Sequence, residues 1–273
     1  NETIHAKTII DATGYNSILG QHNREVHKNA LAVRGYYENL TGLDKTVEIY
    51  FTPSVSPGYF WIFPVNDGTV NVGIGMVISE QRKQVGIKKS LKKMQKDVIA
   101  NHPLFKGRFE NANLVEGSER GWQLPFGSPR KDAPSYQPRR SAMAGAMCIG
   151  DAASLVDPFS GEGIGNALVS AKLTSEIFDK NIHSNGFSEE SANKYMKDLW
   201  NKLGPELTNS YRLQQVIKRK WLLNWFMKKA SKKESITTGK QQYLKQIRAN
   251  TAYPTYRGTI TVITILGYLL AAL

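Results

Sequence analysis

Short apolar runs, separated by glycine, asparagine, aspartate and proline, fill much of the first third of the chain. Such runs are the length of strands, and the residues between them favour turns. We therefore predict a set of antiparallel strands. The expected strands are Ala30–Tyr37, Thr46–Phe51, Gly58–Pro64 and Val70–Met76.

Later in the chain, apolar residues recur at helical spacing. From Gln84 to Ala100 they face a lysine-rich side that we interpret as solvated, so we predict an amphipathic surface helix. A second helix is predicted over Gly165–Lys180. Ser188–Lys229 is predicted to hold two or three helices, interrupted at Gly204-Pro205. The inward residues are Val85, Ile87, Leu91, Met94 and Val98 in the first helix, and Leu168, Ala171, Leu173 and Ile177 in the second.

Two short strands are expected outside these regions. Thr8–Asp11 is a β-branched run closed by a turn at Gly14, as in a strand whose carboxyl end reaches a ligand crevice. Ala144–Ile149 is a strand of small and apolar residues that follows a polar linker, Lys131–Arg140, and runs directly into Gly150-Asp151.

The most informative feature of the composition is the net charge of the chain. A chain of 273 residues with 41% hydrophobic residues can form one large domain or two smaller ones. Its net charge of +13 indicates an anionic partner: nucleic acid, an anionic membrane, a phosphorylated ligand or an acidic redox protein. The single cysteine, Cys148, excludes an intrachain disulfide and a Cys-only metal site, and it fits a reducing, cytoplasmic compartment. We interpret Cys148 as a buried core thiol, and the histidines lack metal-ligand spacing.

The C-terminal part carries two segments that suit a membrane surface. Val216–Lys229 mixes basic residues with Trp221 and Trp225, which is typical of an interfacial helix on anionic lipid, although core packing of these aromatics fits as well. Gly258–Leu273 has no charged residue but is slightly short of the ~20 residues of a spanning helix. We expect peripheral membrane association. Nucleic acid is the weaker explanation of the charge, because no reading module is visible.

The richest chemistry lies between Asp151 and Asn166. A predicted strand ends in a carboxylate, a short loop follows, and Gly161, Gly163 and Gly165 open a helix. A carboxylate at a strand end can accept hydrogen bonds from ribityl hydroxyls, glycines let the backbone approach a ligand, and a helix N-terminus favours an anion. The same residues also fit a glycine-rich turn with a capping aspartate.

This segment resembles the second flavin fingerprint of the geranylgeranyl reductase family, within the p-hydroxybenzoate hydroxylase-like flavoproteins. That fingerprint reads G-D-A-A-x-x-x-D-P-x-x-G-E-G-I-x-x-A, and each fixed position from Gly150 to Ala167 is met. The resemblance implies that Asp151 holds the FAD ribityl chain and that Pro158–Asn166 lies against the isoalloxazine. The implied FAD-binding residues are Gly14, Gly150, Asp151, Pro158, Gly161, Glu162, Gly163, Ile164, Gly165 and Asn166.

A second resemblance is Tyr59-Phe-Trp61-Ile-Phe63-Pro64, which is similar to the family's Y-x-W-x-F-P substrate strand. Period 2 places its three alternate aromatics on one sheet face, where they could pack along an isoprenoid chain or simply form a core strand. Glycines in the next strand suggest close approach by a ligand or a packed segment. The family's proline three residues before the tyrosine is replaced here by Ser56. The implied substrate-binding residues are Tyr59, Trp61, Phe63, Gly73 and Gly75.

The segment Asp11–Ser17 occupies the place of the family's G-A-D-G-x-x-S, with Thr13 where an acid is usual. No strand is followed by G-x-G-x-x-G, the turn that cradles the ADP pyrophosphate. The chain does not begin with Met and has no signal-peptide layout, so we expect the missing βαβ unit to precede Asn1 in a longer protein. The chain alone is then expected to bind FAD weakly or not at all.

The resemblance implies a mixed α/β fold: part of a Rossmann-like FAD-binding domain, an inserted antiparallel-sheet substrate domain and a C-terminal helical region. The expected boundaries are 1–25 and 140–185 for the FAD domain, 26–139 for the substrate domain, 186–257 for the helical region and 258–273 for an apolar tail.

The function implied is FAD-dependent reduction of C=C bonds in a prenyl chain, as in geranylgeranyl diphosphate or a prenylated lipid, with NAD(P)H or a ferredoxin-like protein as electron donor. No catalytic acid or base can be named from the sequence. The alternatives are a flavin monooxygenase or halogenase on the same scaffold, and a non-catalytic, membrane-bound lipid carrier.

Overall fold

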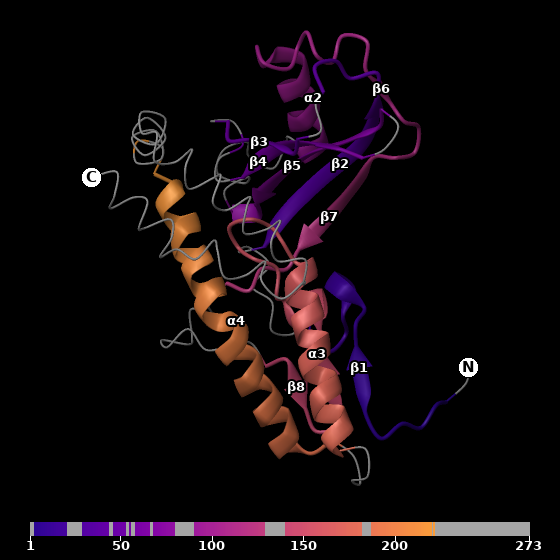
Figure 1. Ribbon diagram of the computed structural model, residues 1–273, viewed down its shortest axis with the longest axis vertical. Helices are drawn as coiled ribbons and strands as arrows, with labels where there is room; N and C mark the ends of the chain where they lie inside the picture. Colours follow the sequence, from indigo (N-terminus) through magenta and orange to yellow (C-terminus); the bar gives the residue numbers. More distant parts are fainter. Residues whose placement is uncertain are drawn as a thin grey trace, which may run out of the picture. The chain divides into compact units, whose positions relative to one another are not determined.

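The computed structural model describes residues 3–20, 29–43, 46–52, 55, 58–65, 68–79, 90–128, 140–181, 187–219 and 221 (Figure 1). The chain divides into two compact units. We call 25–125 the sheet unit, and 1–24 together with 126–273 the fingerprint unit. The predicted linker Lys131–Arg140 falls almost wholly outside the described residues, as does the chain beyond Trp221.

The sheet unit is a six-stranded antiparallel sheet, as the sequence predicted for its first four strands. Its strand order is β3-β4-β5-β2-β6, and β7 also pairs with β2. The register places Tyr59 opposite Gly75 and Trp61 opposite Gly73. The strands are β2 (Ala30–Glu38), β3 (Glu48–Tyr50), β4 (Tyr59–Pro64), β5 (Val70–Val77), β6 (Asn113–Leu114) and β7 (Arg120–Leu124).

One face of this sheet is covered by helix α2 (Leu91–Asn101). The interface is apolar: Phe60, Ile62 and Ile74 are fully buried, and the helix contributes Leu91, Met94 and Val98. Burial of this face by a helix supplies the main driving force for the unit, at roughly 25 cal/mol per Å² of apolar surface. The opposite sheet face is half-exposed.

The predicted start of this helix at Gln84 is wrong. Ser90 is extended, and its hydroxyl accepts a hydrogen bond from the Lys93 amide, which makes it the N-cap of a helix that begins at Leu91. The local capping signal was overlooked because the apolar spacing continues upstream through Val85 and Ile87, both outside the described residues.

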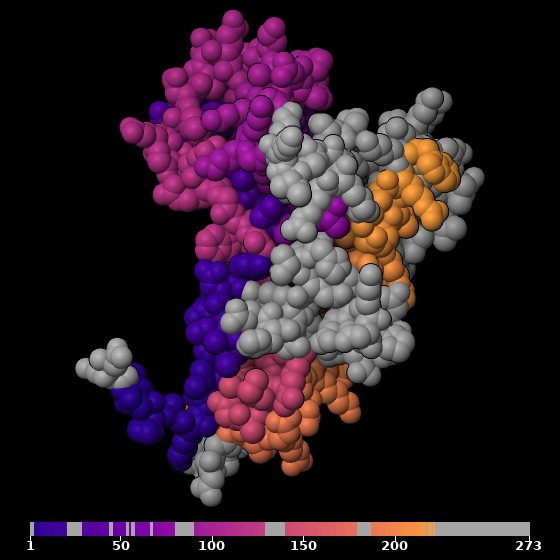
Figure 2. Space-filling view, turned by 180° about the vertical axis from the view of Figure 1, so that it is seen from behind, coloured from indigo at the N-terminus to yellow at the C-terminus, as the bar shows by residue number. Residues whose placement is uncertain are grey.

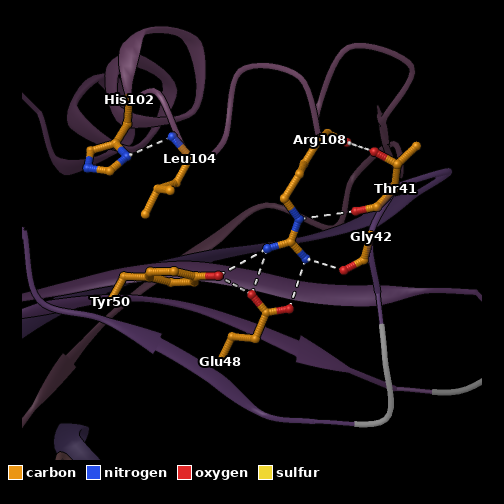
Figure 3. A network of polar contacts seen from close by, with 7 residues as sticks. All are labelled: Thr41, Gly42, Glu48, Tyr50, His102, Leu104 and Arg108. Carbon is orange, nitrogen blue, oxygen red and sulfur yellow. Dashed lines mark hydrogen bonds and ion pairs between the residues drawn. The ribbon is translucent and has the colours of Figure 1, made fainter. Parts of the chain in front are cut away.

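A polar cluster holds the segment after α2 against the sheet edge (Figure 3). Arg108 forms a forked ion pair with Glu48 at 2.6 and 2.8 Å, and it also donates to the Tyr50 hydroxyl at 3.0 Å. Its remaining N–H groups donate to the carbonyls of Thr41 and Gly42, both at 3.1 Å. All five guanidinium donors are therefore used. The hydrogen bonds to Glu48 raise the pKa of Arg108 above its ordinary value.

The fingerprint unit contains a three-stranded sheet in the order β1-β9-β8. Strands β1 (Ile9–Asp11) and β9 (Ala146–Cys148) run parallel, and β8 (Ala142–Met143) is antiparallel to β9. The strand predicted from Ala144 begins instead at Ala146, because Gly145, at φ +78°, closes a hairpin with β8. The indigo N-terminal part of the chain, which includes β1, reaches the surface in Figure 2, where Ile9 and Ile10 are exposed whereas Asp11 is buried.

Two long helices pack together against this sheet, α3 (Ile164–Asn181) and α4 (Glu189–Ile217) (Figure 1). The predicted interruption at Gly204-Pro205 is wrong, because α4 runs through both residues. Pro205 lies on the exposed side, whereas the buried residues Leu199, Leu203 and Leu207 continue one apolar face past it. Tertiary packing thus outweighs the hydrogen bond that proline removes.

The buried face of α3 also differs from the expected one. Leu168 is 55% exposed, whereas Asn166, Ser170 and Thr174 are buried together with Ile177. A polar stripe at i, i+4 spacing is therefore buried, and two of its members, Asn166 and Ser170, pair with backbone groups of Leu155 and Gly150. No helix in the described ranges is both long enough and apolar enough to cross a membrane. The basic aromatic segment and the apolar tail lie almost entirely outside those ranges.

Replacing Arg108 with methionine is expected to destabilise the sheet unit by about 2–4 kcal/mol, because Glu48 is left largely buried without its partner. Arg108→Lys keeps the charge but loses the fork, so it should recover only part of this loss. Urea unfolding measures both. The control is Lys92→Ala, which removes an exposed pair with Glu119 and should change stability by less than about 1 kcal/mol. Equal losses in Arg108→Met and the control would contradict the assigned role.

Candidate functional site

Parallel pairing of β1 and β9 brings two chain segments together at the carboxyl ends of both strands. The Ile149 amide donates to the Asp11 carbonyl at 3.0 Å, so the turn after β9 starts beside the turn after β1. The contact continues further along: a Cβ added to Gly20 would lie 2.0 Å from the Ala152 carbonyl oxygen. In open α/β sheets, this end of the strands is where ligands bind.

The first of these turns is organised by Asp11. Its carboxylate accepts hydrogen bonds from the Thr13 amide at 3.0 Å, the Thr13 hydroxyl at 2.6 Å and the Ser17 hydroxyl at 2.6 Å. Burial alone would raise the pKa of Asp11, but the hydrogen bonds from Ser17 and Thr13 outweigh it and hold this pKa below its ordinary value. Gly14 follows at φ +73°, with open space where a side chain would be.

The second turn is the 3-10 segment Gly150–Ala153, in which Gly150 adopts φ +56°. The Gly150 amide donates to the Ser170 hydroxyl at 2.9 Å, and a Cβ on Gly150 would approach that of Ala167 to 3.0 Å. Glycine is therefore needed here for both conformation and close packing on α3. Ser154 closes the segment in the left-handed region, at φ +55°.

The loop that follows is closed on itself through Asp157. The Asp157 carboxylate accepts from the amides of Phe159 at 2.9 Å and Ser160 at 2.7 Å, and Gly161 turns the chain at φ +74°. The side chain of Gln214, which is 3% exposed, donates from α4 to the carbonyl of Pro158. Sequence reasoning missed Gln214 as a support of this loop, since no local motif marks it.

At the start of α3, the glycines and Glu162 form a compact arrangement. A Cβ on Gly163 would lie 3.3 Å from Asp151 Oδ1, so the missing side chain keeps the backbone close to that carboxylate. Glu162 accepts a hydrogen bond from the Gly165 amide at 2.6 Å. This side chain therefore satisfies one of the helix N-terminal donors, and its charge suits the positive end of the dipole. Ile164 is 78% exposed beside it.

The predicted FAD-binding residues thus gather on two adjoining turns and the first turn of α3, all within the fingerprint unit. Asn166 has a supporting contact: its buried amide donates to the Leu155 carbonyl at 2.6 Å. The exposed residues around these turns include Ser160, Glu162 and Ile164, together with Ala12 and Thr13 of the first turn. In the part of the chain that the structure describes, no group of three His, Cys, Asp or Glu residues could hold a metal ion.

The predicted substrate residues lie on the half-exposed face of the sheet unit. Tyr59, Trp61 and Phe63 form one row of rings, with centroids 5.8 and 6.0 Å apart. A Cβ on Gly73 would lie 2.0 Å from Trp61 Cζ2, so the indole ring packs over this glycine. Gly75 is different, because an added Cβ there would make only ordinary contacts of 3.6 Å or more. The sequence suggested that a ligand or a packed segment comes close to Gly73 and Gly75. At Gly73 that neighbour is the Trp61 side chain.

The chain is similar in sequence to a known protein family and to several characterised proteins. Residues 30–107 match a family model described as the geranylgeranyl reductase catalytic domain. A digeranylgeranylglycerophospholipid reductase of Thermoplasma acidophilum is 28% identical over 233 residues, covering 82% of this chain and 50% of that protein. The chain is therefore similar to geranylgeranyl reductases, most directly over residues 30–107. It spans about half the length of the curated relatives it matches.

Solved structures share the fold of this chain, which confirms the predicted mixed α/β fold class. A geranylgeranyl bacteriochlorophyll reductase-like protein from Thermoplasma acidophilum gives a TM-score of 0.69 at 23% identity, over 97% of this chain and 62% of that one. A flavin-dependent brominase gives 0.63 at 16% identity, over 99% and 64%. At these identities the likeness shows the fold, which reductases and halogenases share.

The hydrogen bonds to Asp11 generate a pH dependence of stability. A carboxylate with a lowered folded-state pKa stabilises the fold above its unfolded pKa of about 3.9, and this contribution disappears as the pH falls through the folded value. Asp11→Asn is therefore expected to be less stable than the parent at pH 7, and the difference should shrink only as the pH falls below the ordinary carboxyl pKa and through the lowered folded-state pKa of Asp11. Urea unfolding at pH 7, 5 and 3 measures it, with exposed Glu176→Gln as control. A deficit that is constant with pH would contradict this role.

Proposed function

We propose that this chain supplies the flavin-ring-binding and substrate-binding parts of an FAD-dependent reductase that saturates C=C bonds of a prenyl chain. The observation that carries the proposal is the fingerprint geometry: the carboxylate of Asp151, in the 3-10 turn after β9, lies against the backbone of Gly163, just before α3 begins. The match of residues 30–107 to the geranylgeranyl reductase model and the name of the Thermoplasma acidophilum relative support a prenylated glycerophospholipid or a related isoprenoid as substrate.

The residues present fit a flavin. A ribityl chain offers hydroxyl donors, for which the Asp151 carboxylate is a suitable acceptor, and the glycines at 161 and 163 leave backbone accessible beside it. Exposed Ile164 provides an apolar contact for a ring edge. Asp157 and Gln214 are assigned a supporting role, because their hydrogen bonds fix the loop rather than face outward. Gly14 is assigned to the same cofactor site from the adjoining turn.

The half-exposed sheet face suits a long apolar substrate. Directly opposed residues of antiparallel strands share a face, so Tyr59, Gly75, Ala32 and Trp122 form one row across four strands. Aromatic rings stand at both ends of this row, and the smallest residues lie between them. A narrow unsaturated chain can pack along such a strip by dispersion and by exclusion of water. Trp61 and Phe63 extend the aromatic side of the strip.

Reduced FAD, when bound, supplies the hydride for this reaction. The contribution assigned to the protein is positioning: the fingerprint loop orients the cofactor, and the aromatic face holds the chain and excludes water from it. The electron donor is NAD(P)H or an acidic, ferredoxin-like protein, and the net charge of +13 favours the acidic partner electrostatically.

The same charge supports peripheral association of a cytoplasmic protein with an anionic membrane, where prenylated lipids reside. Lys218 and Arg219 are followed by Trp221, which is 68% exposed. This pairing of basic and aromatic side chains suits the lipid headgroup region.

Anaerobic turnover tests the reaction. The complete gene product is incubated with dithionite-reduced FAD and either geranylgeranyl diphosphate or a digeranylgeranylglycerophospholipid, and products are analysed by mass spectrometry. Gain of two hydrogens per double bond without oxygen is the expected result. The likeness to a flavin-dependent brominase makes oxygen activation the competing function, and strict dependence on oxygen would favour it. Lipid binding without turnover under either condition would favour a carrier.

Gly163→Ala is expected to weaken FAD binding roughly tenfold, equivalent to about 1.4 kcal/mol, because the new methyl group presses on Asp151 Oδ1 and Val156. Flavin fluorescence titration of the complete gene product and of its variants measures the affinity. Gly107→Ala serves as the matched control, since its added methyl group meets nothing within 4 Å. Unchanged affinity in a correctly folded Gly163→Ala variant would remove Asp151 and Gly163 from the cofactor site.

A further inference from the structure

Three serine side chains in the fingerprint unit are buried without a hydrogen-bond partner. The hydroxyl oxygens of Ser128, Ser141 and Ser154 are inaccessible to solvent and unpaired, and the three residues are only 3%, 4% and 3% exposed. Burying a hydroxyl without a partner costs about 1–3 kcal/mol. Three such groups in one small region therefore call for a partner that the side chains and backbone do not supply.

All three serines line a single cavity of ≈ 20 Å³. Segments far apart in sequence contribute to it: Ser128 follows the bridge between Phe126 and Val156, Ser141 precedes β8, and Ser154 ends the 3-10 turn of the fingerprint. The rest of the wall is largely apolar, and its larger part comes from α4. These α4 residues are Leu199, Trp200, Leu203 and Leu207.

We propose that this cavity is a binding site for one buried water molecule, which bridges the three serine hydroxyls. A cavity needs about 10–15 Å³ to admit a water molecule, so the available volume accepts one and leaves little room for a larger ligand. Buried waters typically make about three hydrogen bonds to groups that otherwise lack partners, which is the number of hydroxyls here. The apolar α4 wall closes the remaining side.

The position of Ser154 gives this water a structural task. Ser154 has φ +55°, a conformation that is uncommon outside glycine and asparagine, and it lies three residues before Asp157. A bridge from its hydroxyl to Ser128 and Ser141 would hold the fingerprint turn to both neighbouring segments. This inference rests on the burial of the hydroxyls and not on the proposed activity, so it can be tested without flavin.

A crystal structure of the full chain at high resolution tests the site directly. The expected result is a water peak within about 3.2 Å of at least two of the three hydroxyl oxygens. Serine hydroxyls paired with one another around an empty centre would overturn the proposal.

Thermal unfolding of Ser128→Ala and Ser141→Ala gives an independent test through the sign of the effect. If water satisfies the hydroxyls, each substitution removes a hydrogen bond and should lower Tm by about 2–4 °C. If the hydroxyls are unsatisfied, removing one relieves a penalty and Tm should rise. Ser175→Ala, at an exposed position of α3, is the control and should shift Tm by less than about 1 °C.

A combined variant separates a shared water from three independent effects. Ser154→Gly removes the hydroxyl while keeping the left-handed conformation accessible. Together with Ser128→Ala it should lower Tm by clearly less than the sum of the two single changes, since both act on one water molecule. Strict additivity would argue against a common ligand. Should a variant fail to fold, the crystallographic result for the parent still decides the question.

Discussion

The fingerprint unit depends on one backbone pairing, the parallel alignment of β1 with β9. Parallel strands end at the same edge of a sheet, so this alignment delivers Asp11 and Gly150 to one place although 138 residues separate them. The turns then follow from local chemistry: Asp11 draws Thr13 and Ser17 around its carboxylate, and positive φ values turn the chain at Gly14 and Gly150. Helix α3 then holds the second turn in place, because the Ser170 hydroxyl accepts a hydrogen bond from the Gly150 amide.

Much of the fold was predictable because its signals are local. The strand runs between residues 30 and 77 are short, apolar and bounded by turn residues, and each of them forms an antiparallel strand. Predictions failed where local and tertiary signals conflict. Gly204-Pro205 is a strong local break, yet the helix continues because apolar residues on both sides of it bury against the same core. Conversely, upstream apolar spacing suggested a longer α2 than the Ser90 cap allows.

The candidate site was predictable in its composition but not in its supports. A fingerprint of fixed spacing points to Asp151 and the glycines that follow it, and the fold places Gly163 beside Asp151. No sequence motif marks Gln214, because it donates to the Pro158 carbonyl from α4, 56 residues further along the chain. The role of the Ser154 hydroxyl also could not be predicted from the sequence, because nothing local distinguishes a serine that lines a cavity from one that faces solvent. Long-range packing contacts of this kind require the folded structure.

The packing of Trp61 over Gly73 has a consequence for how this sheet face can diverge among relatives. The indole of Trp61 occupies the volume that any side chain at position 73 would need. The sizes of the residues at positions 61 and 73 are therefore coupled. A larger residue at 73 is compatible with the fold only if position 61 becomes smaller, and a smaller residue at 61 opens a furrow across the middle of the sheet. Paired changes at 61 and 73 would therefore reshape this face while leaving the buried core on its opposite side, including Phe60 and Ile62, unaltered.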